Sequence, residues 1–217
     1  LLVADELPML KHLAALAQEY TDCGVVLDSP NVPALLGAAE AVHGQALIFN
    51  SVTACERIDE ILPAAASLHA GVIALPMKKR MPEGARERIE ITEELIGRLT
   101  GAGIPESDIY IDCIVEALSA GDDKPRAALE AIRCIRAAHP LVHLTGGISN
   151  VSFGLPGRAQ VTATFLAMAV AEGLDSPIVD ITSPAVKASL RAAMALSGED
   201  EFCMDYIRSM REAQKKG

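Results

Sequence analysis

The sequence predicts an α/β protein built on a parallel sheet, and three observations lead to this prediction. Short apolar runs alternate with longer amphipathic segments along the chain. The short runs are apolar at nearly every position, as strands covered on both faces are. Of the 217 residues, 50% are hydrophobic but only 3% are aromatic, so the core must be built from small aliphatic side chains. Such cores suit helices packed on a buried parallel sheet.

The elements follow one another as a strand and then a helix, six times in succession. The helical segments carry apolar residues at the helical period. In residues 125–138, for example, Ala128, Ile132 and Ile135 fall on one stripe. Expected strands are residues 25–27, 46–49, 72–75, 109–111, 141–144 and 177–179, and expected helices are residues 8–20, 32–42, 57–69, 85–100, 125–138, 158–172, 184–196 and 200–215.

Six strand–helix units with right-handed crossovers leave two architectures, an open doubly wound sheet or a closed (β/α)8 barrel. No G-x-G-x-x-G motif opens a first strand–helix turn, which weakens the open nucleotide-binding sheet. A closed barrel needs two more units, or about 50 to 60 residues. The chain begins at Leu1 without an initiator Met, so we expect N-terminal units to be missing from it. We expect residues 1–217 to form a single domain.

The charge and the cysteines exclude several classes of function. The net charge of −10 argues against nucleic acid and anionic membrane surfaces, because both are bound through Lys and Arg. No run reaches the about 18 to 20 apolar residues of a membrane span, and no signal peptide is evident. The five cysteines are scattered, with no C-x-x-C, so neither a disulfide framework nor a metal site is predicted. We expect reduced thiols in a cytoplasmic protein.

Polar residues stand where the expected strands end. In a parallel barrel the carboxyl ends of the strands form the catalytic face, so we expect these side chains to converge there. For Asp28 and Asp180 the alternative is a helix N-cap, a position that Asp favours. The residues at strand ends are Asp28, Asn50, Asp112, Asn150 and Asp180.

Carboxylates and amides in such a group favour recognition of a flat heterocycle over hydrolysis. A carboxylate pairs well with two adjacent N–H donors, and an Asn side chain can donate and accept at once. No His stands at a strand end, and no nucleophile is evident. A pterin ring, with its 2-amino group and N3–H, presents the donor pair that a carboxylate recognises.

One segment carries a family resemblance. Residues 146–156, G-G-I-S-N-V-S-F-G-L-P, resemble the G-L-S-N-V-S-F-G-L-P segment of the folate-binding module of cobalamin-dependent methionine synthase. They also resemble the G-L-S-N-V-S of methyltetrahydrofolate:corrinoid/iron–sulfur protein methyltransferases. Further stretches resemble this family in the same order: L-D-S at 27–29, F-N-S at 49–51, A-x-E-R at 54–57, Y-I-D at 110–112, T-F-L-A-M-A at 164–169 and G-L-D at 173–175.

The resemblance implies a (β/α)8 TIM barrel of the pterin-binding, dihydropteroate synthase-like type, usually a homodimer. It implies a methyltransferase that moves a methyl group between N5 of tetrahydrofolate and the cobalt of a corrinoid. By resemblance, Asp28, Asn50 and Asp112 bind the pterin ring, and Asn150 lies by N5 as the catalytic residue. The chain has no D-x-H-x-x-G cobalamin signature, so we expect a separate corrinoid protein as the partner. Further candidates for the site are Ser51, Gly147, Ser152, Arg158 and Asp180.

The chain also departs from the family pattern. The family's first two strands have no counterpart here. The segment P-M-K-K at 76–79 is more basic than the family pattern, and Cys113 follows Asp112 where Pro is common. These departures bear on substrate geometry and on the corrinoid partner. Lys78 and Arg158 are possible contacts of that partner, and a solvated surface charge is the alternative for both.

Other functions stay open at this point. Thr145-Gly146-Gly147-Ile148 follows a late strand, where barrel isomerases and aldolases bind phosphate, and Lys78 could then form a Schiff base. Dihydropteroate synthase shares the pterin barrel, but its Ser-Arg-Lys and Asp-Pro-Gly motifs do not occur here. A binding module without catalysis is the remaining alternative.

Overall fold

The structure is a computed structural model that describes residues 6–216, with side chains described up to residue 212. The expectation of missing N-terminal units rests on Leu1, which lies outside the described residues. The Cα positions divide into two compact units. Unit one comprises Leu1–Asp112 and Pro140–His143, and unit two comprises Cys113–His139 and Leu144–Gly217.

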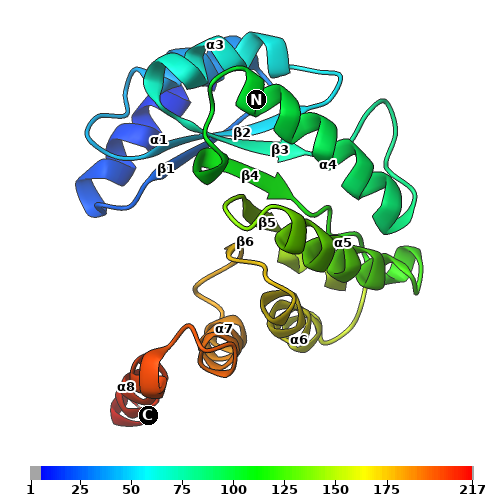
Figure 1. Cartoon of the computed structure of the whole chain (residues 1–217). Coiled ribbons are helices and arrows are strands. Elements are labelled where there is room, and N and C mark those ends of the chain that lie inside the picture. The colour runs from blue at the N-terminus through cyan, green and yellow to red at the C-terminus, as the bar shows by residue number, and fades with distance from the viewer. Residues whose placement is uncertain (1–5, 217) are drawn as a thin grey trace. The chain divides into compact units, whose positions relative to one another are not determined.

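Unit one is a parallel sheet of four strands in the order β1-β2-β3-β4, with helices over one face (Figure 1). Strands and helices alternate along the chain, as the sequence predicts. The elements are α1 (Glu6–Tyr20), β1 (Val25–Asp28), α2 (Val32–Ala39), β2 (Leu47–Thr53), α3 (Ile58–Leu68), β3 (Gly71–Leu75), α4 (Gly84–Gly101), η2 (Glu106–Asp108) and β4 (Ile109–Asp112).

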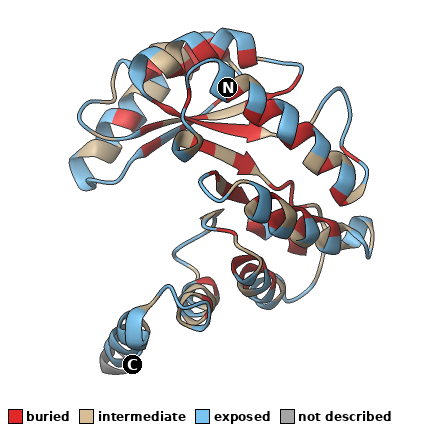
Figure 2. Cartoon of the chain, viewed as in Figure 1, coloured by how far each residue is buried: buried red, intermediate tan, exposed pale blue. Residues whose placement is uncertain are grey.

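The two faces of this sheet differ in burial. In β1, Val25 and Leu27 are buried while Val26 and Asp28 are exposed, and β4 alternates between buried and half-buried residues. Because successive side chains of a strand point to opposite faces, one set packs under the helices and the other set faces away from them. The buried set includes Phe49 at 0% exposure, and Figure 2 shows the buried residues concentrated between strands and helices.

Unit two pairs β5 with β6 in parallel and contains the helices α5, α6, α7 and α8. Buried apolar residues of α5 and α6, among them Ile132 and Leu166, build its core with Leu144 of β5. Its elements are η3 (Leu118–Ala120), α5 (Lys124–Ala138), β5 (His143–Gly147), η4 (Ile148–Ser152), α6 (Arg158–Ala171), β6 (Ser176–Ile178), α7 (Pro184–Leu196), η5 (Glu201–Cys203) and α8 (Met204–Lys216).

All six expected strands and all eight expected helices form, with shifted bounds. We expected β5 at residues 141–144, and it spans His143–Gly147. The observed strand continues through Gly146 and Gly147, although glycine is a weak strand former. Gly146 and Gly147 pair with Pro177 and Ile178 of β6, and this pairing outweighs the local preference.

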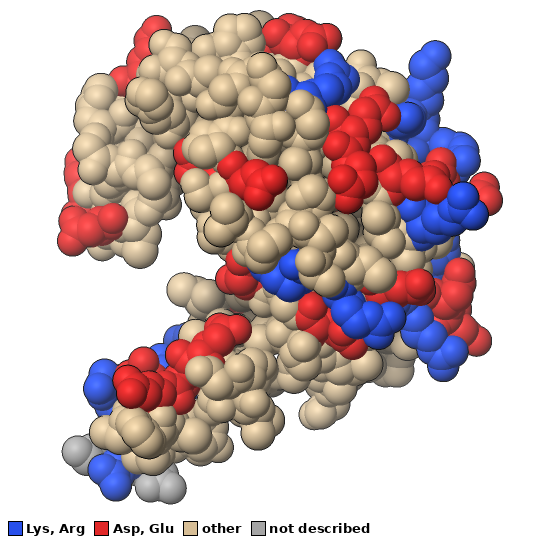
Figure 3. Space-filling model, in the orientation of Figure 1, with Lys and Arg blue, Asp and Glu red and all other residues tan. Residues whose placement is uncertain are grey.

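Residues of α4 form ion pairs within the helix and with α3. Arg86 pairs with Glu90 at 2.8 Å on the helix, and Arg98 reaches Asp59 of α3 at 2.8 Å. The drawn face of Figure 3 shows Lys and Arg interspersed with Asp and Glu. In the part of the chain that the structure describes, no helix is long and apolar enough to cross a membrane.

Candidate functional site

Three of the predicted site residues share the helix-free face of the sheet in unit one. Asp28 and Asn50 are direct partners in the β1–β2 register, so their side chains point to the same face side by side. The register continues from Asn50 to Ile73, and from Ile73 to Tyr110. Asp112 stands two residues beyond Tyr110 and therefore faces the same way, closer to the carboxyl end of β4.

The side chains of Asp28 and Asn50 keep their hydrogen-bonding capacity. Asp28 is exposed and Asn50 is half-buried. Among the described residues, none forms a hydrogen bond with the carboxylate of Asp28 or the side-chain amide of Asn50. The N-cap alternative for Asp28 is wrong, because the side chain of Asn31 caps α2 by accepting from the Ala34 N–H. Two adjacent strands thus present a carboxylate and an amide on one surface.

A hydrogen bond from Arg57 connects the loops that follow β1 and β2. Its Nη1 donates to the carbonyl of Ser29 at 3.0 Å, and the Ser29 hydroxyl in turn bonds Glu6 and the Asn31 N–H. Arg57 precedes α3 with φ at 62°, a left-handed conformation that is uncommon outside glycine. Reasoning from residue types missed Arg57, although it closes the A-x-E-R stretch of the family resemblance. Ser51 lies in the register shift of β2 between Asn50 and Val52.

In unit two, Asn150 sits on η4, the 3-10 turn that follows β5. Its side chain is exposed and lies against the backbone of Gly147. A Cβ added to Gly147 would come within 3.0 Å of the Asn150 Nδ2, so the glycine leaves room for the amide. Ser152, the last residue of η4, is fully buried, and Arg158 of α6 donates from Nε to the Ser152 hydroxyl at 3.2 Å.

Asp180 closes a turn and does not cap a helix. Its Oδ1 accepts from the backbone N–H of Thr182 at 2.8 Å and from the Thr182 hydroxyl at 2.6 Å. The Thr182 hydroxyl, followed by the Thr182 N–H, holds the pKa of Asp180 below its usual value. The N-cap of α7 is Ser183. A pocket of about 180 Å³ in unit two is lined by Ser149, Arg158, Ala159, Thr162, Val179, Asp180, Ser183 and Val186.

Lys78 lies in the loop after β3 and is paired with Glu94 of α4. Their charged atoms are 2.7 Å apart, and the hydrogen bond and charge of Glu94 raise the pKa of Lys78. A lysine that forms a Schiff base needs a lowered pKa, so this pairing argues against the aldolase alternative. The phosphate alternative weakens too, because Gly146 and Gly147 lie within β5 and are followed only by the five-residue 3-10 helix η4, not by an α-helix.

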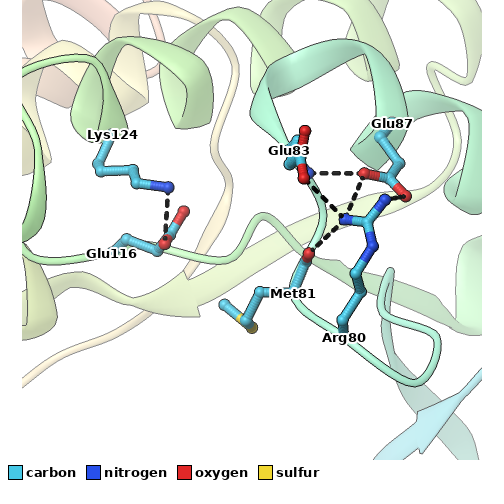
Figure 4. A network of polar contacts seen from close by, with 6 residues as sticks. All are labelled: Arg80, Met81, Glu83, Glu87, Glu116 and Lys124. Atoms are coloured by element: carbon cyan, nitrogen blue, oxygen red, sulfur yellow. Dashed lines mark hydrogen bonds and ion pairs between the residues drawn. The ribbon is translucent and has the colours of Figure 1, made fainter.

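The same loop is held to α4 by Arg80 (Figure 4). Arg80 donates to Glu87 at 2.9 and 3.0 Å and to the carbonyl of Met81 at 2.9 Å, while the Glu83 N–H donates to Glu87. The Glu83 N–H and Arg80 lower the pKa of Glu87. Two of the three basic side chains at 78–80 are thus paired, with Glu94 and Glu87, which weakens the attraction of this stretch for an anionic partner.

The remaining features offer less chemistry. A larger pocket of about 560 Å³ lies along α5 and α6 in unit two, and its lining includes none of the predicted site residues. Within the described residues, no group of three His, Cys, Asp or Glu side chains is arranged to hold a metal ion. The candidate site is therefore made of hydrogen-bonding side chains, namely carboxylates and amides at the carboxyl ends of parallel strands.

Comparison with solved structures supports the predicted fold class. The structure matches a Yersinia pestis dihydropteroate synthase in complex with a sulfonamide drug, with a TM-score of 0.71 and 15% identity, over 92% of this chain and 76% of that chain. A Coxiella burnetii dihydropteroate synthase in complex with pteroic acid matches with a TM-score of 0.67 and 15% identity, over 89% and 74% of the two chains. The predicted α/β barrel of the dihydropteroate synthase type is thereby confirmed.

Comparison of sequences gives the family. The methylcorrinoid:tetrahydrofolate methyltransferase of Eubacterium limosum is 28% identical over 213 residues, which are 96% of this chain and 78% of that protein. The methionine synthase of Mycobacterium leprae is 32% identical over 184 residues, 78% of this chain but only 15% of that much longer protein. The model of the family described as pterin binding enzyme matches residues 4–180, so the chain belongs to the pterin binding enzymes.

Proposed function

We propose that the protein transfers a methyl group between N5 of tetrahydrofolate and the cobalt of a corrinoid carried by a partner protein. Two kinds of relative support this function, a methylcorrinoid:tetrahydrofolate methyltransferase and the methionine synthases. The observation that carries the proposal is the side-by-side placement of Asp28 and Asn50, with Asp112 on the same face of the sheet.

We propose that Asp28, Asn50 and Asp112 recognise the pterin ring. A carboxylate accepts two parallel N–H bonds from the 2-amino group and N3–H of the ring, in the geometry that makes charge-assisted pairs strong. Asn50 matches a mixed edge, because its amide donates and accepts. Ser51, at the register shift beside Asn50, is a further candidate for this set.

Asn150 acts at N5 in this proposal. Methyl transfer from N5 to Co(I) breaks the N5–CH3 bond and leaves its electron pair on N5, which makes the amine a poor leaving group unless N5 is protonated. Asn cannot supply a proton near neutral pH, so the proton comes from solvent. The Asn150 carbonyl oxygen accepts a hydrogen bond from N5–H⁺ and stabilises the positive charge. The corrinoid supplies the nucleophile, while this chain supplies orientation and electrostatics.

Domain organisation, assembly and location complete the proposal. Residues 1–217 form one pterin-binding domain, since the family match from 4 to 180 includes parts of both compact units. The protein forms a homodimer, and exposed apolar side chains on the C-terminal helices suit such an interface: Leu196 is 88% exposed and Phe202 is 83% exposed. The protein is cytoplasmic, which agrees with five cysteines that form no disulfide.

The test is a spectroscopic assay of Co(I) and methyl-cobalt with free cobalamin and each folate form. Methyltetrahydrofolate with Co(I), or methylcobalamin with tetrahydrofolate, should give enzyme-dependent conversion. The Asn150→Ala variant should lose about 10²–10³ in rate with saturating folate, the usual loss when one preorganised contact is removed. Conversion that stays at the uncatalysed level in both directions would refute the function, and an unaltered Asn150→Ala rate would refute the role of Asn150.

A further inference from the structure

The turn that carries Asn150 is short and needs support from outside. The 3-10 helix η4 spans five residues, Ile148–Ser152, and such helices have poorer hydrogen-bond geometry than α-helices. Among the described residues, none forms a hydrogen bond with the Asn150 side-chain amide. The orientation of the amide is therefore set by the backbone of the turn and by whatever fixes that backbone.

Hydrogen bonds of buried hydroxyl groups stabilise the turn. The Ser152 hydroxyl donates to the Ser149 carbonyl at 3.0 Å and lies 2.9 Å from the Thr162 hydroxyl of α6. Arg158 Nε also donates to the Ser152 hydroxyl. A hydroxyl has one proton and two lone pairs, so Thr162 must be the donor to Ser152. The proton and both lone pairs of the Ser152 hydroxyl are then all in hydrogen bonds, so the turn has a single hydrogen-bonded arrangement.

The Arg158 guanidinium donates hydrogen bonds to residues of the turn on both sides of Asn150. Its Nη2 donates to the carbonyl of Ser149 at 3.2 Å, while its Nε bonds Ser152. The guanidinium carbon also lies 5.9 Å from the ring centroid of Phe153, whose N–H donates to the Asn150 carbonyl at 3.0 Å. A planar guanidinium can make two directed bonds and stack on an aromatic ring at once, whereas a lysine ammonium cannot reproduce this geometry.

We infer that Arg158 is a positioning residue that orients the Asn150 amide. It acts through Ser149, Ser152 and Phe153 and does not bind the folate itself. This inference rests on the proposed role of Asn150 at N5. It also assigns Ser152 and Thr162 to the support of the turn, where the family resemblance alone made Ser152 a candidate contact of the substrate.

The test compares Arg158→Ala and Arg158→Lys with Arg133→Ala, which removes an exposed arginine of α5 in the same unit. We expect kcat for methyl transfer to fall at least tenfold in both Arg158 variants, with KM for methyltetrahydrofolate changed less than twofold. Ethylguanidine added to Arg158→Ala should restore part of kcat, and Arg133→Ala should behave as wild type. A higher KM with unchanged kcat would overturn the inference, since it would make Arg158 a binding residue.

A double-mutant cycle separates this inference from the function on which it rests. If Arg158 acts through Asn150, Arg158→Ala should cost almost nothing further in an Asn150→Ala background. The same fold loss in both backgrounds would overturn the positioning role while leaving the role of Asn150 intact. Wild-type activity in Asn150→Ala alone would instead overturn the role of Asn150 at N5, on which this inference rests, while leaving the proposed methyl transfer intact. Circular dichroism of each variant checks folding, and the conservative Arg158→Lys change covers the case in which Arg158→Ala unfolds.

Discussion

The Gly147→Ala substitution tests the placement of Asn150 without changing Asn150. Gly147 has φ at −74°, which alanine adopts without backbone strain, so the effect is steric. The new Cβ would lie 3.0 Å from the Asn150 Nδ2, 3.6 Å from its Cγ and 3.9 Å from its Oδ1. A comfortable separation is about 3.5 Å, so the amide nitrogen must retreat by about 0.5 Å.

A displacement of this size has a predictable cost. Misplacing a reacting group by about 1 Å can cost about 10²-fold in rate, so half that shift should cost about tenfold. Single-turnover methyl transfer measures the rate, and calorimetric titration with methyltetrahydrofolate measures pterin affinity. We expect kcat of Gly147→Ala to fall about tenfold while the pterin Kd changes less than twofold.

The matched control is Gly97→Ala on α4, where an added Cβ meets no atom within 4 Å. It should leave the rate unchanged and raise the free energy of unfolding by about 1 kcal/mol, the difference in helix propensity between Gly and Ala. If Gly147→Ala transfers the methyl group as fast as wild type and binds the pterin equally well, the Asn150 amide does not act from its place beside Gly147.

Three further outcomes are expected. Lys78→Ala should keep methyl transfer within twofold of wild type, and borohydride should trap no substrate on Lys78; a trapped adduct would restore the aldolase alternative. The backbone N–H groups of Asp205 and Tyr206 lower the pKa of Asp200, so its stabilisation of α8 is complete above its ordinary pKa of 3.8 and is lost as the pH falls through the lower folded value. The protection factor of the Tyr206 amide against hydrogen exchange should therefore fall below that pH in wild type but not in Asp200→Asn, and a wild-type protection factor that does not change with pH would contradict this. Leu95→Ala in unit one and Ile132→Ala in unit two remove side chains at fully buried positions, so each should lower the free energy of unfolding by about 2 to 5 kcal/mol. Both should shift one common thermal transition, and two separate transitions would contradict a single domain.

Much of the candidate site in unit one could be predicted from the sequence. Each strand end was marked by a polar residue behind an apolar run, and the carboxyl ends of parallel strands meet at one edge. The register of Asp28 with Asn50 and the alternation along β4 agree with that prediction. These features depend only on strand period and strand order, which a single sequence carries.

Contacts between distant elements could not be predicted. Lys78 and Glu94 are separated by a loop and by half of α4, so nothing local marks their pairing. Arg158 looked like a substrate or partner contact because its bonds to Ser149 and Ser152 depend on how α6 packs on η4. The extension of β5 through two glycines likewise depends on β6 as its pairing partner.

Some local chemistry was readable but ambiguous. Asp180 fits a strand-end ligand, a helix N-cap and a turn equally well by residue type. The spacing D-x-T allows the carboxylate to bond the N–H and hydroxyl of Thr182, and this short-range pair forms. Arg57 shows the opposite case, because only the A-x-E-R resemblance marks it, and its left-handed φ follows from the tight loop between β2 and α3.

The most direct measurement is the pterin affinity of Asn50→Ala beside that of wild type, determined by calorimetric titration with methyltetrahydrofolate. Asn50 is half-buried, and no described residue hydrogen-bonds its amide, so its removal takes away a ligand contact and no internal one. Loss of a hydrogen bond to a desolvated ring edge costs about 1 to 3 kcal/mol, so Kd should rise about 5- to 150-fold. A Kd within twofold of wild type would contradict pterin recognition by the strand-end side chains of this sheet.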